Sequence, residues 1–303
     1  MANILKVYKN GNATIAIFDD GTRIINSKDD RLDLEYPLSV DMKITNSCNM
    51  GCPYCHEDSK PNGPHADLKN LPYLTTFLPY TEVAIGGGNI LEHPDIDWLL
   101  ETYKEKHILA NVTINQKHFV ESYDRIKNWV DNDLVKGVGI SLTDNKDPKF
   151  LELVKTIPNA VIHVINGIFS YEDYQYIKDH NLNMLILGYK TFRRGKSFLD
   201  IKANDDLLRE RWEWLNFNLE GVSKHFKAVA FDNLGLEQLP VKELAGDNWD
   251  HLYQGDDGSS SFYIDAVNKQ YSRNSTAAIE GERYPIMENV KDMFADIRRK
   301  TGN

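Results

Sequence analysis

The chain has 303 residues, of which 41% are hydrophobic and 26% are charged, and its formal net charge is −10. This length allows one large α/β domain or two small ones, and no apolar run is long enough to span a bilayer, so we expect no membrane association. The negative charge disfavours nucleic acid as a partner, because binding to its phosphates depends on lysine and arginine.

Residues 1–37 are expected to form an N-terminal β-meander. Apolar segments within residues 3–26 are separated by short polar stretches around Gly11 and Gly21. Asparagine, aspartate and glycine tolerate the positive φ angles of hairpin turns, so both stretches predict antiparallel connections. Such a meander either forms part of a substrate cover or only caps the fold.

The segment that follows holds every cysteine of the chain. Cys48, Cys52 and Cys55 are spaced as C-x3-C-x2-C, which places three thiolates on one short loop. Thiolates favour zinc, copper(I) and iron–sulfur clusters. A [4Fe–4S] cluster normally takes four cysteines, so a cluster bound by three keeps an open coordination site on one iron. A catalytic cluster needs such an open site, and we therefore predict a cluster here.

Three other kinds of site share parts of this pattern. A structural zinc site could combine the three thiolates with His56, although zinc knuckles usually draw their ligands from two separated pairs. Residues 52–56 match the C-x-x-C-H pattern of c-type haem attachment, but that chemistry requires export, and no signal-peptide pattern is visible at the start of the sequence. A redox C-x-x-C site is disfavoured by the additional cysteine and by the strand predicted before the loop.

From residue 38 onward, short apolar runs alternate with amphipathic segments. The predicted strands are residues 38–44, 82–85, 110–114, 135–142, 160–165 and 183–187, and the predicted helices are residues 95–106, 119–132, 148–156 and 171–179. This alternation is typical of βαβ units with a parallel sheet. Right-handed crossovers would roll six such units into an open barrel, with its ligand site at the carboxyl ends of the strands.

The rest of the chain is predicted to add a long helix, one more strand and a small extension. The helix covers residues 205–226, and the strand over residues 228–231 delivers Asp232 to its end. Asp232 could orient a substrate or serve as a turn or helix cap. Residues 236–303 are expected to form an α+β extension with a hairpin at residues 255–275 and a closing helix over residues 287–299.

The C-x3-C-x2-C motif, with Tyr54 before its last cysteine and an apolar strand before the loop, resembles the radical S-adenosylmethionine (radical SAM) superfamily. The resemblance implies an α/β fold with a partial (βα)6 barrel over residues 38–235. It implies two cofactors, a [4Fe–4S] cluster held by Cys48, Cys52 and Cys55, and S-adenosylmethionine bound to the open iron. It also implies reductive cleavage of S-adenosylmethionine to a 5′-deoxyadenosyl radical, which abstracts hydrogen from the substrate.

The resemblance further implies where S-adenosylmethionine is bound. Family members bind the methionine ammonium with a glycine loop that usually ends in an acidic residue, whereas here Asn89 offers a neutral amide oxygen. A plain turn without a ligand is the alternative for this loop. Polar residues at strand ends contact the carboxylate or the ribose, and a glycine-bearing segment holds the adenine. The implied contacts are Tyr54, Gly86, Gly87, Gly88, Asn89, Asn115, Ser141 and Gly188.

The hairpin at residues 255–275 is similar to the SPASM and twitch extensions of peptide-modifying radical SAM enzymes. Those extensions carry cysteines for an auxiliary cluster, whereas all three cysteines of this chain lie in the motif loop, so we expect no auxiliary cluster. We expect the hairpin to act as a metal-free lid or docking surface. The similarity favours a peptide or protein side chain as the substrate.

Together these features predict a cytoplasmic radical SAM enzyme that is reduced by a partner such as flavodoxin or ferredoxin. Free cysteines grouped in one segment fit a reducing cytoplasm. An enzyme that acts on a small metabolite or nucleotide is one alternative, and a non-catalytic iron–sulfur or zinc-binding protein is another. The sequence singles out no residue as a catalytic acid or base.

Overall fold

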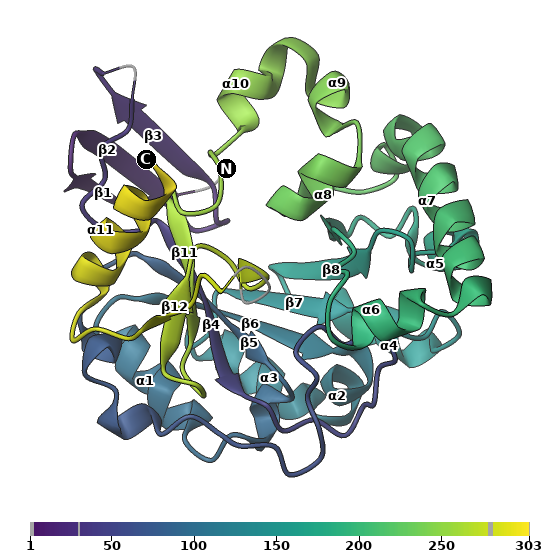
Figure 1. The fold of residues 1–303 in the computed structure, drawn as a ribbon, viewed down its shortest axis with the longest axis horizontal. Helices are drawn as coiled ribbons and strands as arrows, with labels where there is room; N and C mark the ends of the chain where they lie inside the picture. Colours follow the sequence, from purple (N-terminus) through teal and green to yellow (C-terminus); the bar gives the residue numbers. More distant parts are fainter. Residues whose placement is uncertain (1–2, 30, 278–280, 303) are drawn as a thin grey trace.

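A parallel β-sheet forms the centre of the structure (Figure 1). The computed structural model describes residues 3–29, 31–277 and 281–302. The central strands are β4 (Ser39–Thr45), β5 (Glu82–Gly87), β6 (Leu109–Asn115), β7 (Gly137–Ser141), β8 (Ala160–Ile165), β9 (Asn183–Leu187) and β10 (Ala228–Phe231). They lie side by side in chain order, each parallel to its neighbours. Every strand predicted from residue 38 to residue 231 is therefore confirmed.

The sheet curls around a cavity of ≈ 810 Å³. Each of the strands β4 to β10 contributes residues to the lining of this cavity, among them Asp41, Asn111, Gly139, His163 and Leu185. Strands at the two ends of a flat sheet could not reach the same cavity, so the sheet must curve around it, and we refer to this curved sheet as the barrel. The α/β fold predicted from the alternation of strands and helices is confirmed.

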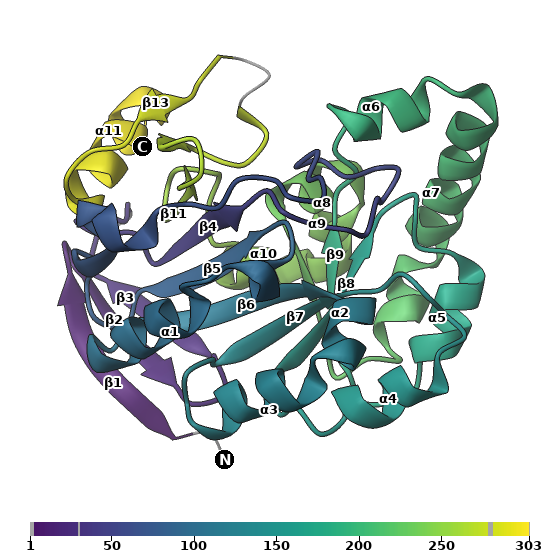
Figure 2. The same ribbon diagram turned by 90° about the horizontal axis from the view of Figure 1, so that it is seen from below.

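Helices α1 to α5 cover the outer face of the sheet (Figures 1 and 2). The helices of this region are α1 (Ile96–Glu105), α2 (Gln116–Glu121), α3 (Tyr123–Asp131), α4 (Pro148–Val154), α5 (Tyr171–Ile177) and α6 (Arg194–Leu199), with short 3-10 helices η1 (Leu68–Asn70), η2 (Pro72–Thr75) and η3 (Ile90–Glu92). The single helix predicted over residues 119–132 is wrong. The structure has two helices that meet at Ser122, whose φ of −116° lies outside the helical range.

The long helix predicted over residues 205–226 is found as α7 (Lys202–Ser223). Leu208, Leu215, Leu219 and Val222 form its buried side, while Phe217 on its other side is 89% exposed. Such a helix packs one stripe against the protein and leaves the rest in water. Among the residues that the structure describes, no helix combines the length and apolar character needed to cross a membrane.

A small antiparallel sheet covers the amino-terminal end of the barrel. It consists of β1 (Ile4–Asn10), β2 (Ala13–Phe18) and β3 (Arg23–Ser27) in this order, which confirms the predicted meander. Leu5, Ile17 and Phe18 line the barrel cavity beside Glu82 and Lys136, which lie where β5 and β7 begin. The meander therefore closes the end of the cavity that lies opposite the carboxyl ends of the strands.

The C-terminal extension joins the main sheet rather than standing apart from it. Its elements are α8 (Asn233–Gln238), α9 (Val241–Ala245), η4 (Gly246–Asn248), α10 (Trp249–Leu252), β11 (Ser261–Asp265), β12 (Gln270–Ser272), β13 (Tyr284–Pro285) and α11 (Val290–Thr301). The predicted hairpin is confirmed as β11 and β12, which are antiparallel. However, β11 also pairs in parallel with β4, so the hairpin extends the barrel sheet.

Candidate active site

The cysteine motif lies on a loop at the carboxyl end of β4. Cys48, Cys52 and Cys55 all line the barrel cavity, and each is a free thiol. Burial raises the pKa of the Cys48 and Cys52 thiols, and negative charge on neighbouring cysteines raises it further. A positively charged group between the thiols would therefore favour their deprotonation.

The donor chemistry of this loop fits a [4Fe–4S] cluster. Three soft ligands share one cavity, and the buried Ser59 hydroxyl on the same loop has no hydrogen-bond partner in the described part of the chain. Among the described residues, no three histidine, cysteine, aspartate or glutamate side chains are already arranged to hold a metal ion. The role of the three cysteines as cluster ligands thus stays a prediction, supported by their residue type and shared cavity.

Arg194 holds the cysteine loop from the side of α6. Its Nε donates to Asp58 Oδ1 at 2.7 Å, its Nη1 donates to the Cys52 carbonyl at 3.3 Å, and its Nη2 donates to the Ser59 carbonyl. The guanidinium charge also lowers the pKa of Cys48 and Cys52, although burial outweighs it. Arg194 therefore stabilises the loop that carries the thiols.

The glycine loop packs directly against the first residues of the cysteine loop. Gly88 N donates to the Thr45 carbonyl at 2.8 Å, and Asn89 N donates to the Ser47 carbonyl at 2.6 Å. A Cβ atom on Gly88 would lie 2.2 Å from the Ser47 carbonyl oxygen, and Gly87 has a φ of +115°. Glycine is thus required here for the close approach of two loops, and all three glycines, Gly86, Gly87 and Gly88, also line the cavity.

The side chain of Asn89 is engaged in local structure. Its Oδ1 accepts from Leu91 N at 3.3 Å as the N-cap of η3, and its Nδ2 donates to Glu92 Oε1 at 3.1 Å. Asn89 is 8% exposed and is not one of the residues found to line the cavity. The carboxylate at this corner is that of Glu92, which accepts from the Ser47 hydroxyl. The predicted contact between Asn89 and S-adenosylmethionine stays a prediction.

The other predicted cofactor contacts all lie on the cavity wall. Tyr54, Asn115, Ser141 and Gly188 line it from the cysteine loop and from the ends of β6, β7 and β9. Asn115 Oδ1 also accepts from Lys117 N at 2.9 Å and caps α2. Burial raises the pKa of Tyr54 to about 12, so its phenol is neutral. Their contacts with a bound cofactor stay predictions.

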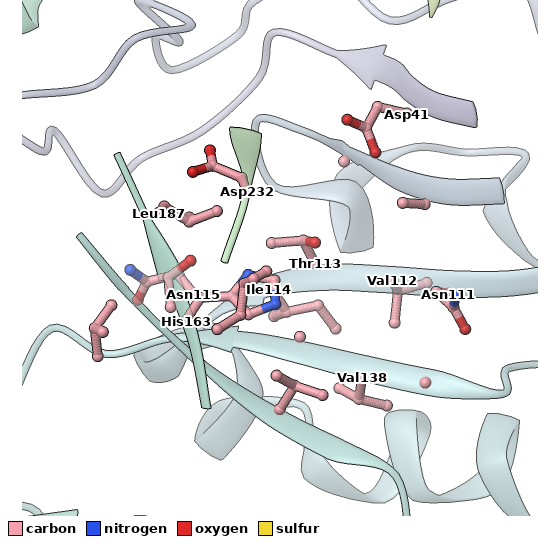
Figure 3. Close-up of a pocket in the computed structure, with 18 of the residues that line it drawn as sticks. Asp41, Asn111, Val112, Thr113, Ile114, Asn115, Val138, His163, Leu187 and Asp232 are labelled. Carbon is pink, nitrogen blue, oxygen red and sulfur yellow. The ribbon is translucent and has the colours of Figure 1, made fainter. Parts of the chain in front are cut away.

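The cavity also contains titratable side chains at mid-strand positions (Figure 3). The His163 imidazole lies over Gly139, where an added Cβ would be 2.3 Å from the ring, and burial lowers its pKa to about 4. Burial raises the pKa of Asp41 to about 6, with the charges of Asp232 and Asp257 acting in the same direction. The cavity therefore contains a neutral imidazole, that of His163, and a carboxyl group that can accept a proton, that of Asp41.

Asp232 is held in place by backbone donors. Its Oδ1 accepts from Gly188 N at 2.8 Å and from Gly235 N at 2.7 Å, so it caps α8 as the sequence allowed. Burial also raises the pKa of Asp232. The positive charge of Lys190 acts on this pKa in the opposite direction, and Lys190 Nζ donates to Ser275 Oγ at 2.9 Å.

Among the charged cavity residues that the sequence analysis did not single out, two left a signal in the sequence. Asp41 and Lys43 stand at alternate positions in the apolar run of residues 38–44, and both line the cavity. Because alternate residues of a strand share one face, two charges at this spacing indicate a polar interior face. That pattern was visible in the sequence and would have identified both residues.

Comparisons with known proteins place this geometry in a known fold. No family model and no curated protein matches the chain. Streptococcus suis SuiB bound to precursor peptide SuiA is similar at a TM-score of 0.58 and 12% identity, covering 92% of this chain and 84% of that chain. SuiB bound to S-adenosylmethionine is similar at a TM-score of 0.55 and 13% identity, covering 90% of this chain and 82% of that chain.

A second protein gives the same result. The structure of anSMEcpe with bound AdoMet is similar at a TM-score of 0.55 and 14% identity, covering 86% of this chain and 80% of that chain. SuiB and anSMEcpe are radical SAM enzymes, and likeness at this level of identity establishes the fold. The chain thus has the fold of the radical SAM enzymes, as its cysteine motif and its alternation of strands and helices predict.

Proposed function

We propose that this protein is a radical SAM enzyme that modifies a peptide or protein side chain. One observation carries the proposal: the three cysteines of the motif line the cavity around which the barrel curls, from the carboxyl end of β4. In open α/β sheets ligands bind at this end of the strands. Two solved structures with the same fold contain a peptide, SuiB with SuiA and anSMEcpe with the Cp18Cys peptide.

The residues of the cavity have distinct roles in this proposal. Cys48, Cys52 and Cys55 would hold a [4Fe–4S] cluster, and the chemistry supplied by the bound group is reductive cleavage of S-adenosylmethionine followed by hydrogen abstraction. The glycine loop and the strand ends orient the cofactor. The meander excludes water from the far end of the cavity through Leu5 and Phe18, which protects a reactive intermediate.

A second cavity supports a substrate longer than a small metabolite. It has a volume of ≈ 900 Å³ and lies between helices α8 to α10 and a later part of the C-terminal extension that includes β13 and α11. Tyr189 and Lys190 line both cavities, so the second continues from the mouth of the first. Its wall includes Trp249 and Tyr253, whose rings are stacked at 4.8 Å. An extended peptide could occupy this groove while one side chain enters the barrel.

The proposal also names a setting and an electron donor. A cluster of this kind must be reduced before each cleavage of S-adenosylmethionine, and we propose a small electron-transfer protein such as flavodoxin or ferredoxin. Free thiols at the cavity fit a reducing compartment. We therefore propose that the enzyme acts in the cytoplasm.

The proposal is tested by anaerobic reconstitution with iron and sulfide. We expect about four irons per chain and the formation of 5′-deoxyadenosine when S-adenosylmethionine and dithionite are added. Cys48→Ala, Cys52→Ala and Cys55→Ala should each abolish both results. Stoichiometric zinc without iron, or a full cluster that never cleaves S-adenosylmethionine, would contradict the proposal.

A further inference from the structure

A buried lysine joins two segments of the chain that are far apart in sequence. Lys43 on β4 is 2% exposed, and its partners Glu57 and Asp265 are 7% and 0% exposed. Lys43 Nζ lies 2.8 Å from Glu57 Oε2 and 3.4 Å from Asp265 Oδ2. Glu57 follows Cys55 by two residues, and Asp265 ends β11 in the C-terminal extension.

The pairing continues on both sides of Lys43. Arg283 Nη1 lies 2.9 Å from Asp265 Oδ2, and Arg193 Nη1 lies 3.4 Å from Glu57 Oε2. Five side chains of alternating charge, Arg283, Asp265, Lys43, Glu57 and Arg193, thus form what we term the ion chain; the Arg193 side chain at its end is 31% exposed. It runs from the segment before β13, through the barrel sheet, to the cysteine loop and the start of α6.

Stability alone is a weak reason for such an arrangement. The cost of taking charges out of water offsets much of their attraction, so apolar residues of similar size often stabilise a protein as well or better. Removing one member of a buried pair, in contrast, leaves its partner desolvated and unpaired, and the partner then moves toward water. For Glu57 such a movement would carry the last cysteine of the motif with it.

We propose that Lys43 is a positioning residue: by binding Glu57 and Asp265 together, it fixes the cysteine loop relative to the C-terminal extension and so keeps the three thiols in one arrangement. The purpose of that arrangement, to hold a cluster, rests on the proposed function. The positioning itself rests only on the contacts given above. In this chain an extension without cysteines thereby acts on the motif loop through charge.

The test measures thiol reactivity in the full-length, metal-free protein, so that it does not depend on cluster binding. The protein is treated with iodoacetamide under native conditions, and alkylation of Cys48, Cys52 and Cys55 is followed by peptide mass spectrometry. Lys43→Met should increase the rate at Cys55 by about tenfold or more, because Glu57 loses its shortest ion pair, at 2.8 Å, and keeps only longer contacts such as that with Arg193 at 3.4 Å, so that the loop opens locally more often. Asp265→Asn, which keeps the shape of the side chain, should also increase the alkylation rate of Cys55.

A matched control separates positioning from general destabilisation. Ile126 on α3 is fully buried outside the ion chain, and Ile126→Ala lowers the melting temperature without touching the loop. The variants are compared at temperatures that lie equally far below their own melting temperatures. If Cys55 is alkylated no faster in Lys43→Met and Asp265→Asn than in Ile126→Ala, the proposal is wrong. If Lys43→Met fails to fold, the Cys55 alkylation rate of Asp265→Asn, compared with that of Ile126→Ala, decides whether the proposal holds.

A second readout uses the protein after anaerobic loading with iron and sulfide. Lys43→Met should shift the midpoint potential of the cluster, since a displaced cysteine loop would change the hydrogen bonds and the solvent exposure at the cluster sulfurs, while Ile126→Ala should leave it unchanged. An unchanged potential in Lys43→Met contradicts the proposal. If the wild-type chain binds no iron, the proposed function fails while the alkylation result still decides the role of Lys43.

Discussion

Asp41 illustrates how a single residue can be surrounded by protein and still be open to the water in a cavity. It lies at mid-strand on β4 and faces the barrel interior (Figure 3). Burial raises its pKa to about 6, whereas an unfolded aspartate titrates near about 3.9. The folded chain therefore binds this proton more tightly. Its contribution to stability is fully present below about pH 4 and is lost as the pH rises through about 6.

Asp41→Asn should therefore stabilise the protein at neutral pH. At pH 7 the variant avoids burying a charge, and we expect its free energy of unfolding to exceed that of the wild type by about 1 kcal/mol after allowance for screening by cavity water. Urea unfolding at several pH values measures this difference, which should disappear toward about pH 4. A gain that is equal at all pH values would show that titration of Asp41 is not the cause.

Asn89 gives a second prediction at this scale, because its side chain caps η3. Asn89→Ala removes the acceptor for Leu91 N and should cost about 1 kcal/mol in the free energy of unfolding. Asn89→Ser is the matched control, since serine also caps helices and should recover most of the loss. Equal stability of Asn89→Ala and the wild type in urea would leave the residue free for the predicted cofactor contact.

At the scale of elements, the glycine loop shows how close packing fixes residue type. A Cβ on Gly88 would lie 2.2 Å from the Ser47 carbonyl, so Gly88→Ala must push the glycine loop away from the cysteine loop. We expect a loss of about 1–3 kcal/mol in chemical unfolding, together with faster alkylation of the motif cysteines. Gly221 on α7 has no atom within 4 Å of an added Cβ, so Gly221→Ala should instead stabilise by about 0.5–1 kcal/mol.

The strands were predictable because each is an apolar run with clear ends. The predicted runs 82–85 and 183–187 agree with β5 and β9 to within two residues. The break at Ser122 was not predictable, since amphipathic spacing continues across it. The pairing of β11 with β4 also left no local signal, because it joins segments more than two hundred residues apart and depends on the whole sheet.

In the candidate site, the residues that belong to sequence motifs were predictable, whereas those defined by distant partners were not. Motif spacing identified Cys48, Cys52 and Cys55, and the family resemblance indicated the glycine loop; the three cysteines and the three glycines of that loop line the cavity. Glu57 and Glu92 were missed because their significance comes from partners elsewhere in the fold. The sequence shows that a residue is charged, but only the structure shows that its charge is buried and paired.

At the scale of the whole molecule, three parts enclose one cavity. The meander closes its amino-terminal end, the barrel forms its wall, and the C-terminal extension borders its mouth through Tyr263 and Ser275. We predicted from the sequence that the extension acts as a lid or docking surface. Since β11 pairs with β4 and α11 is buried against the extension of the sheet, we now expect it to contribute to global stability.

This expectation is tested by a pair of phenylalanine variants. Phe294 on α11 is 0% exposed, and its ring centroid lies 6.1 Å from that of Phe262 on β11. Phe294→Ala should lower the free energy of unfolding by about 3–5 kcal/mol, as removal of a buried aromatic ring does. Phe217→Ala, at an 89% exposed position on α7, should change it by less than about 0.5 kcal/mol. Urea unfolding should remain a single transition in both variants. If Phe294→Ala unfolded the extension in a separate, earlier transition, the extension would be an independent lid, and the coupling of the extension to the barrel through β11 would be wrong.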